Sequence, residues 1–412
     1  MILGALKSRL REGSYTLISS IAELPDPTSP LLQIGAYESL PFPHILSHPT
    51  TTLANAYIIR KALIRKHYLS TTAFNWITKN PFSILATNIK PACDFELDYA
   101  QFLDESLVEA WELRGSFERN DGQEAAEREW WILKPGMSDR GQGIRLFSTE
   151  QELQSIFEEW EAERPASEDE DEDEDQNNTE RTDDKKKGEE EGDYIVTSHL
   201  RHFIAQPYIH PPLLLTSNPR KFHIRTYVLA VGALQVYVYK QMLALFASSP
   251  YIPPWTPPTS DTGLNLSPHL TNTCLQPSVH DGTVQSFFSL PSSDLSPSMK
   301  DNIFKQICDT TGEMFEAAAK GMMVHFQVLP NVFEVFGVDF LVDERGTAWL
   351  LEVNAFPDFR QTGEELKAVV GGLWEGVVDV AVAGYFGVEG KGRGKAGEGE
   401  MVLVREVEMG RR

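Results

Sequence analysis

Residues 333–359 read FEVFGVDFLVDERGTAWLLEVNAFPDF, and this stretch decides the fold. Its pattern predicts two strands, over 333–343 and 348–355, joined by a tight turn at 344–346. Both strands are largely apolar, which is typical of strands that are buried on both faces. The rest of the chain is interpreted around this predicted hairpin.

Polar side chains interrupt both predicted strands. Asp339 lies in the first strand, and Glu352 and Asn354 lie in the second. Residues two apart in a strand share a face, and a hairpin brings Asp339 beside the other two. Two carboxylates and an amide oxygen are hard ligands that suit Mg²⁺ bound together with phosphates. The alternative is a pair of acids at strand ends that Lys, Arg or backbone groups satisfy, because a buried carboxylate needs a partner. The spacing alone leaves both interpretations open.

The composition indicates an ordinary globular protein. The chain has 412 residues, of which 41% are hydrophobic and 24% charged, enough for a large core and two or three lobes. We expect no apolar run long enough to span a membrane and no signal peptide at the N-terminus. Cys93, Cys274 and Cys308 are far apart and odd in number, which argues against a disulfide framework and for a reducing intracellular setting.

The charge is unevenly distributed. The net charge is −23, and residues 165–192 hold 14 acids and 4 bases, so this segment contributes −10 and the remainder −13. An acidic remainder gives no electrostatic footprint for binding duplex nucleic acid. The acidic run predicts a disordered surface insert over 162–192. We predict an N-terminal segment over 1–50, one main domain over 51–386 that contains the insert, and a flexible tail over 387–412.

A glycine-containing loop lies between two predicted strands in residues 130–147, WWILKPGMSDRGQGIRLF. A strand–loop–strand arrangement is neither a Walker loop nor a Rossmann turn, because both of those open helices. Glycines such as Gly143 still allow backbone N–H groups to approach phosphates, and Lys134 adds a positive charge. The alternative is a plain hairpin loop.

Basic side chains follow one face of a further predicted strand. Residues 221–231 (KFHIRTYVLAV) and 234–245 (LQVYVYKQMLAL) alternate and predict a second hairpin. Lys221, His223 and Arg225 share a face, which favours contact with phosphates over an exposed edge strand.

Helical patterns occur in four places. Residues 57–69 predict a basic helix carrying Arg60, Lys61, Arg65 and Lys66, either as a solvated face or as a basic wall near an anionic ligand. Residues 99–113 predict an amphipathic helix, and two more helices are expected over 301–322 and 364–386. Short strands are expected at 15–19, 31–35 and 202–209.

Taken in order, the motifs WILKP with its glycine loop, QPYI, KFHIRTYV, HLTN, FGVDFLVD and WLLEVNAFPDF resemble the tubulin-tyrosine-ligase family, a branch of the ATP-grasp superfamily. The resemblance covers residues 55–385, and the wording is most similar to the fungal branch linked to processing bodies. It implies an α+β ATP-grasp fold, with the nucleotide held between two α+β lobes and with ATP and Mg²⁺ as cofactors.

The resemblance also implies an ATP-dependent carboxylate–amine ligase that joins a free amino acid to a protein carboxylate through an acyl phosphate. The acceptor would carry an acidic or C-terminal carboxylate, with tubulin as a candidate. The implied location is the cytoplasm, including processing bodies. The alternative function is an ATP-binding scaffold in cytoplasmic RNA–protein assemblies with weak or lost ligase activity.

The resemblance assigns roles to residues that match the family's motifs. It implies that Mg²⁺ is held by Asp339, Glu352 and Asn354. Phosphates would be covered by Lys134, Gln142 and Gly143. Adenine would be lined by Gln206, Pro207, Tyr208 and Ile209. Lys221 and His223 would lie near the ribose and phosphates, and Thr271 and Asn272 near the phosphate or acyl phosphate, with Asn272 and Arg225 as catalytic residues. Two departures stand out: His223 replaces the family's usual Asp, and Leu245 replaces an Arg thought to hold the amino acid's carboxylate.

Overall fold

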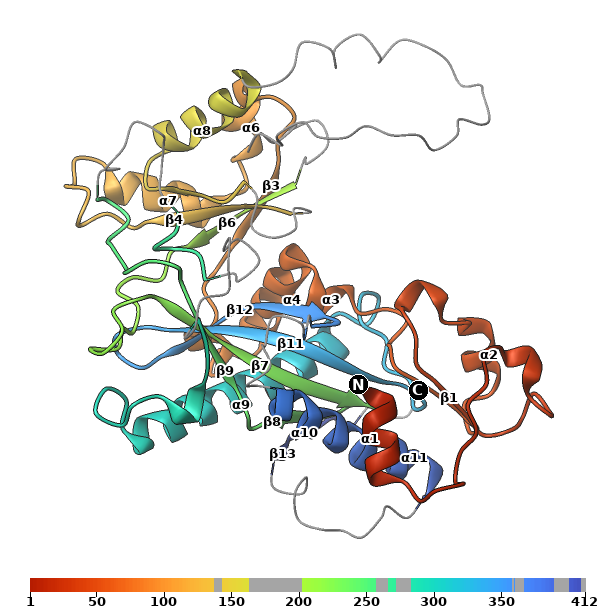
Figure 1. Ribbon diagram of the computed structural model, residues 1–412. Coiled ribbons are helices and arrows are strands. Elements are labelled where there is room, and N and C mark those ends of the chain that lie inside the picture. Colours follow the sequence, from red (N-terminus) through yellow and green to blue (C-terminus); the bar gives the residue numbers. More distant parts are fainter. Residues whose placement is uncertain are drawn as a thin grey trace, which may run out of the picture. The chain divides into compact units, whose positions relative to one another are not determined.

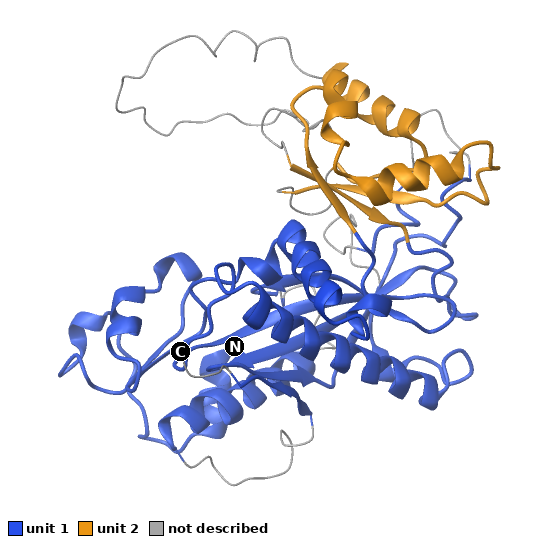
Figure 2. Cartoon of the chain, turned by 180° about the vertical axis from the view of Figure 1, so that it is seen from behind, with its two compact units in different colours: residues 1–91, 209–412 blue, residues 92–208 orange. Residues whose placement is uncertain are grey.

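The computed structural model describes residues 1–136, 143–162, 202–256, 266–271, 283–357, 359, 367–388 and 400–408. The chain divides into two compact units (Figure 2). Unit 1 comprises Met1–Pro91 and Ile209–Arg412, and unit 2 comprises Ala92–Tyr208. Unit 1 therefore contains the N-terminal segment, and unit 2 lies in the chain between its two parts.

Unit 1 is built on a seven-stranded antiparallel sheet (Figure 1). Its main path runs β10-β9-β7-β11-β12, while β8 pairs with β7 and β13 pairs with β8. The strands are β7 (Phe222–Val231), β8 (Gln235–Tyr239), β9 (Leu243–Phe246), β10 (Val284–Ser286), β11 (Phe333–Val342), β12 (Ala348–Ala355) and β13 (Met401–Glu406). The predicted hairpin of β11 and β12 is therefore confirmed.

The second predicted hairpin is confirmed only in part. The stretch 234–245 forms two strands instead of one: β8 pairs with the C-terminal half of β7, and β9 pairs with its N-terminal half. The chain turns between them at Lys240–Met242, where Met242 N–H donates to the Lys240 carbonyl at 2.9 Å. The N-terminal half of β7 is thus flanked by β9 and β11 and is no edge strand.

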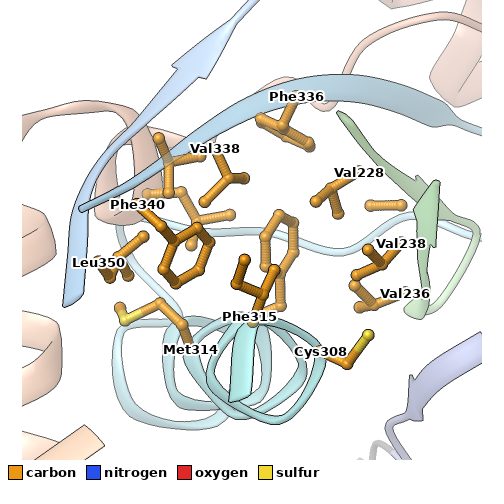
Figure 3. Close-up of a cluster of buried hydrophobic side chains, with 14 of the residues drawn as sticks. Val228, Val236, Val238, Cys308, Met314, Phe315, Phe336, Val338, Phe340 and Leu350 are labelled. Carbon is orange, nitrogen blue, oxygen red and sulfur yellow. The ribbon is translucent and has the colours of Figure 1, made fainter. Parts of the chain in front are cut away.

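One face of this sheet packs on the long helix α9 (Pro297–Gly321). Figure 3 shows Met314 and Phe315 of this helix beneath Phe336, Val338 and Phe340 of β11. Alternate residues of β11 point to this face, and burying them removes apolar surface from water, which is the main stabilising term in folding.

The opposite face is apolar along only part of its length. There, Tyr227, Leu229 and Phe333 pack with Leu373 of α10 (Lys367–Val377) and with Leu6 of α1 (Ile2–Arg9). Farther along the same face, β7 and β11 carry polar side chains, which form the candidate site.

The helix at the C-terminal end of unit 1 continues from α10 through a π-helical turn (Val378–Val382) into α11 (Ala383–Phe386). Our expectation that no apolar run is long enough to span a membrane was wrong, because Lys367–Phe386 meets that test of length and composition. A buried helix of a soluble protein passes the same test, and this helix packs on α1, where Arg9 pairs with Asp379.

The remaining elements of unit 1 are short, except for the 14-residue helix α4. The strands β1 (Leu31–Gln33) and β2 (Thr52–Ala54) pair in parallel. The helices are α2 (Phe42–Ser47), α3 (Lys61–Ile64), α4 (Lys66–Lys79) and α5 (Leu85–Asn88), with 3₁₀ turns η1 (Ile21–Glu23), η2 (Tyr37–Ser39) and η5 (Phe287–Ser289).

Unit 2 is a four-stranded antiparallel sheet in the order β3-β6-β4-β5. Its strands are β3 (Cys93–Glu96), β4 (Trp131–Pro135), β5 (Arg145–Phe147) and β6 (His202–Pro207), and its helices are α6 (Leu103–Ser106), α7 (Trp111–Asn120) and α8 (Glu150–Ala162), with the turn η3 (Ala100–Phe102). Phe157, Trp160 and Phe203 form an aromatic centre with edge and stacked contacts. The predicted strand–loop–strand arrangement is confirmed by β4 and β5.

Several local expectations were wrong. Residues 57–69 do not form one helix, because Arg65 is extended and separates α3 from α4. Residues 99–113 form η3, α6 and the start of α7, so Trp111 is exposed and does not join a buried stripe. Residues 15–19 are not a strand.

The predicted C-terminal tail over 387–412 was also wrong in part, because β13 pairs with β8 along Met401–Glu406. Most of the predicted acidic insert (residues 163–192) lies outside the described residues.

Candidate functional site

The register of the β11–β12 hairpin brings two carboxylates together in unit 1. Asp339 lies opposite Glu352, whereas the next residue of β11, Phe340, lies opposite Leu350. Leu351 is therefore an extra residue, and β12 has a bulge there. The bulge reverses the side on which the strand presents its residues: Leu350 packs in the α9 core, and Glu352 faces the other side beside Asp339.

Asn354 joins the two acids from the same strand. Its Nδ2 donates to Asp339 Oδ2 at 3.3 Å and to Glu352 Oε1 at 3.1 Å. Asn354 lies opposite Gly337, where an added Cβ would approach Arg225 Cδ to 3.4 Å. The glycine thus leaves room for the long side chain of Arg225. The structure brings the three predicted metal ligands together.

Arg225 on β7 neutralises Asp339. It lies directly opposite Asp339, and its Nε and Nη2 donate to the two carboxylate oxygens, the second at 3.0 Å. Burial alone would lower the pKa of Arg225, but the charge and hydrogen bonds of Asp339 outweigh it and raise that pKa above its ordinary value. A bidentate Arg–carboxylate pair is the strong form of such a contact, and it satisfies the buried acid.

His223, two residues earlier on the same face, is buried and connects to Thr271. Its Nδ1 lies 2.6 Å from Thr271 Oγ1, and its Nε2 lies 3.7 Å from Asp339 Oδ1. Burial lowers the pKa of His223, against the opposing charge of Asp339, so the ring is neutral at pH 7. Nε2 is buried and has no hydrogen-bond partner among the described residues.

Lys221 is buried just before β7 begins and affects two further histidines. Burial, followed by the charge of Lys221, lowers the pKa of His269 to about 4. The same two causes lower the pKa of His210. Lys221 is therefore close enough to both histidines to disfavour their protonation.

Lys66 contacts Glu352 from a segment that is distant in the chain. It is the first residue of α4, and its Nζ lies 3.7 Å from Glu352 Oε2. Both side chains are about one-third exposed or less, at 30% and 26%. Lys66 thus lies beside Glu352, and both interpretations of 57–69, a solvated face or a basic wall near an anionic ligand, stay predictions.

The residues present fit a magnesium ion bound with phosphates. Within the described part of the chain, no group of three His, Cys, Asp or Glu could hold a metal by itself. Asp339, Glu352 and Asn354 offer two carboxylates and an amide, and Mg²⁺ takes few protein oxygens and fills its remaining positions with water and substrate phosphates. The Asn354 amide directs its NH₂ group toward the two carboxylates. A 180° rotation of the amide about χ2 would direct its oxygen toward them instead, where it could serve as a metal ligand.

The predicted phosphate and adenine residues of unit 2 lie around β4 and β6. Lys134 and Gln206 share a face of the sheet, and Lys134 Nζ donates to Gln206 Oε1 at 3.0 Å. Gly143 has a φ of 70°, a left-handed conformation that glycine adopts without strain. Tyr208 is buried, and its N–H donates to the Trp130 carbonyl at 2.7 Å.

Three of the remaining predicted residues are described by the structure and two are not. Pro207 ends β6, and Ile209 is buried where the chain re-enters unit 1. Gln142 and Asn272 lie outside the described residues. Leu245 of β9 lies opposite His223 and is buried. Its apolar side chain therefore offers no charged group at this position.

The fold and the acid–amide cluster on adjacent antiparallel strands define a class of protein. The chain has the α+β fold of the ATP-grasp enzymes, and a solved member of that class superposes on it with a TM-score of 0.66 over 94% of this chain. The chain belongs to the tubulin-tyrosine ligase family, whose sequence profile matches residues 68–386. The resemblance seen in the sequence motifs is thereby confirmed.

The relatives include proteins of yeasts. A probable tubulin–tyrosine ligase of Schizosaccharomyces pombe is 44% identical over 386 residues, which cover 93% of this chain and 89% of the relative. The probable tubulin–tyrosine ligase PBY1 of Saccharomyces cerevisiae is 44% identical over 357 residues, 85% of this chain but 46% of that protein. This chain thus spans less than half of the second relative.

The solved structure is the C-terminal domain of Pby1 from K. lactis, an ATP-grasp enzyme that interacts with the mRNA decapping enzyme Dcp2. It is 36% identical to this chain, and the similarity covers 90% of that domain.

Proposed function

We propose that this protein is an ATP-dependent carboxylate–amine ligase that joins a free amino acid to a protein carboxylate. One observation carries the proposal: Asp339, Glu352 and Asn354 converge on one face of the sheet, with Arg225 bidentate on Asp339. Acids that are buried with a cation and an amide at hydrogen-bond distance suit a site for a metal and phosphates. Membership of the tubulin-tyrosine ligase family supports the choice of reaction.

In this proposal Asp339, Glu352 and Asn354 hold Mg²⁺. The ammonium group of Lys66 partly offsets the negative charge of the Glu352 carboxylate. The bound ion neutralises phosphate charge and orients the phosphates for transfer. Arg225 exchanges part of its contact with Asp339 for the transferring phosphate, because a guanidinium matches phosphate as well as carboxylate. Lys221 adds positive charge, and His223, held by Thr271, lies beside Asp339.

The remaining assignments rest on the family motifs. In unit 2, Lys134 and Gly143 cover phosphates, and Gln206, Pro207 and Tyr208 line the adenine, with Ile209 following in unit 1. Gln142 and Asn272 complete the set. The Lys134–Gln206 hydrogen bond supports this arrangement, because it fixes the ammonium group on the face shared by both residues.

The proposed reaction has two steps that balance without a further reactant. A carboxylate oxygen of the acceptor attacks the γ-phosphorus, the bond from that phosphorus to the β–γ bridging oxygen breaks, and ADP leaves. The amine of the amino acid then attacks the acyl carbon, an amide bond forms, and phosphate leaves with the proton passing to solvent. An acidic or C-terminal carboxylate of a protein is the proposed acceptor, with tubulin as the first candidate and the cytoplasm as the proposed location.

Calorimetry of Mg²⁺·ATP binding tests the site directly. We expect the wild type to bind and Glu352→Gln to bind at least about tenfold more weakly, since one charge-assisted ligand is worth about 1.5–3 kcal/mol. Glu316→Gln is the matched control, because Glu316 also pairs with a lysine in unit 1 but lies on α9. Equal binding by wild type and Glu352→Gln would contradict the proposed metal site.

Turnover tests the reaction. We expect ADP release that requires both an acidic peptide and an amino acid, with the peptide gaining the mass of one residue. Turnover with an amino acid and a small carboxylic acid, but without gain of mass by any peptide, would contradict a protein acceptor.

A second candidate function is an ATP-binding protein that has lost ligation and acts in cytoplasmic mRNA-decapping assemblies or processing bodies. Two observations favour it: Leu245 makes the position opposite His223 apolar, and the solved relative interacts with Dcp2. This function predicts Mg²⁺·ATP binding that depends on Glu352 but no transfer to any peptide. The two experiments above therefore separate the candidates.

A further inference from the structure

Arg60 and Glu334 form a buried contact in unit 1, away from the residues assigned above. Arg60 Nε lies 2.8 Å from Glu334 Oε1, and the Glu334 side chain is 0% exposed. The Tyr57 backbone N–H donates to Glu334 Oε2 at 3.0 Å, and Arg60 Nη1 donates to the Tyr57 carbonyl at 3.3 Å. The contact thus joins the segment before α3 to the start of β11.

Burying the polar groups of this contact costs free energy. Glu334 points to the apolar face of the sheet, since it alternates with Phe333 and Val335 of the opposite face. Burial raises the pKa of the Glu334 carboxyl against the opposing charge of Arg60 and the hydrogen bond from Tyr57. Replacing a buried ion pair by apolar side chains is often neutral or stabilising. Stability therefore does not explain why a polar pair stands here.

The guanidinium of Arg60 also contacts two aromatic rings. Its Cζ lies 3.9 Å from the ring centroid of Tyr37 and 5.6 Å from that of Phe356. Phe356 has a φ of 52°, a strained conformation for a bulky residue that persists only when neighbouring contacts hold it. Phe356 directly follows β12, two residues after Asn354. Arg60 thus contacts the residue that directly follows the strand carrying the proposed metal ligands.

The same arginine begins the segment that leads to Lys66. The Arg60 carbonyl accepts from the N–H of Leu63 at 3.1 Å, which closes the first turn of α3. Arg65 follows, and Lys66 then starts α4 and reaches Glu352. Arg60 therefore contacts Glu334 of the core strand β11 and Phe356 after β12, and it lies six residues before Lys66.

We propose that Arg60 is a positioning residue, which through Glu334 and Phe356 fixes the end of β12 and the approach of Lys66 to Glu352. The inference rests on the proposed function, because it concerns the geometry of the proposed Mg²⁺·ATP site. It predicts that the Arg60–Glu334 pair determines the order of the site and not the stability of the fold.

The first test uses the double variant Arg60→Met with Glu334→Met, which removes both polar groups and keeps similar volumes. We expect its melting temperature to stay close to that of the wild type. Hydrogen exchange, followed by mass spectrometry, should nevertheless be about tenfold faster in the peptide covering residues 351–357. Unchanged exchange in that peptide would overturn the proposal. Arg119→Met with Glu129→Met, which removes an exposed pair in unit 2, is the control.

The second test is calorimetry of Mg²⁺·ATP on the same variants. We expect about tenfold weaker binding by the Arg60/Glu334 double variant and unchanged binding by the control. Wild-type affinity in the double variant would show a purely structural pair and overturn the proposal. Absence of binding by the wild type would instead refute the proposed function, while the exchange experiment would still decide whether Arg60 holds the end of β12.

Discussion

Arg225→Met is the substitution whose effect the structure specifies best. It removes the guanidinium that occupies both oxygens of Asp339, whose side chain is 5% exposed. The carboxylate keeps only the amide of Asn354 at 3.3 Å and the neutral ring of His223 at 3.7 Å. Removing one partner of a buried pair costs about 3–5 kcal/mol, because it leaves an uncompensated charge. An unfolding entropy of about 2.1 cal/mol/K per residue gives about 1.2 °C per kcal/mol for 412 residues, so the melting temperature should fall by about 4–6 °C.

The assay is thermal and urea unfolding at pH 7, followed by circular dichroism, on the wild type and three variants. Arg225→Met with Asp339→Asn removes both charges, so it should recover most of the lost free energy of unfolding. Arg119→Met is the matched control, since this arginine pairs with Glu129 at 2.7 Å but is 58% exposed. The control should change the free energy of unfolding by less than about 1 kcal/mol.

Two results would refute this reasoning. A change below about 1 kcal/mol in Arg225→Met would mean that water or other groups already compensate Asp339. A double variant as unstable as the single variant would mean that Arg225 stabilises the sheet by packing and not by neutralising the acid.

Three further predictions concern other parts of the chain. Burial raises the pKa of the Glu334 carboxyl from 4.5 to about 8, so between these pH values the folded state binds a proton that the unfolded state has lost. The free energy of unfolding of the wild type, measured relative to that of Glu334→Gln, should therefore fall as pH rises from 4.5 to 8. The slope should be at most about 1.4 kcal/mol per pH unit, and parallel urea-unfolding profiles for the two proteins would contradict it. Burial raises the pKa of Cys308 to about 12 and that of Cys93 to about 11, so neither thiol should react with iodoacetamide at pH 8 before unfolding, and site-resolved mass spectrometry checks this. Phe315→Ala, in the α9 core, should cost about 3–5 kcal/mol in urea unfolding, whereas Phe74→Ala, at a 62% exposed position, should change little; equal effects would refute the core assignment.

Much of the sheet could be predicted because strand patterns are local. The alternation and turn residues of 333–355 gave both strands of the hairpin with nearly their observed bounds. The pairing of Glu352 with Asp339, and not with Phe340, depended on the bulge at Leu351. A bulge is chosen by which side chains are buried on each face, and the sequence pattern of one strand does not contain that information.

The helices were predicted less well where tertiary contacts override local preference. Residues 57–69 have a helical pattern, yet the chain is extended at Arg65, and the preceding residues are held by Glu334. Similarly, residues 99–113 are broken, and the Ala100 N–H donates to Glu161. In both places a contact distant in the chain satisfies a backbone N–H outside any continuous helix.

The sequence by itself determined the α+β class, the order of the family motifs and the set of polar residues placed in otherwise apolar strands. Only the tertiary structure decided that Arg225 neutralises Asp339, that Lys66 reaches Glu352, and that β13 completes the sheet from beyond residue 400. The physical reason is the separation along the chain over which each kind of interaction acts. Periodicity and turn chemistry depend on neighbours along the chain, whereas the partner of a buried charge is selected by the desolvation cost that distant segments must jointly offset.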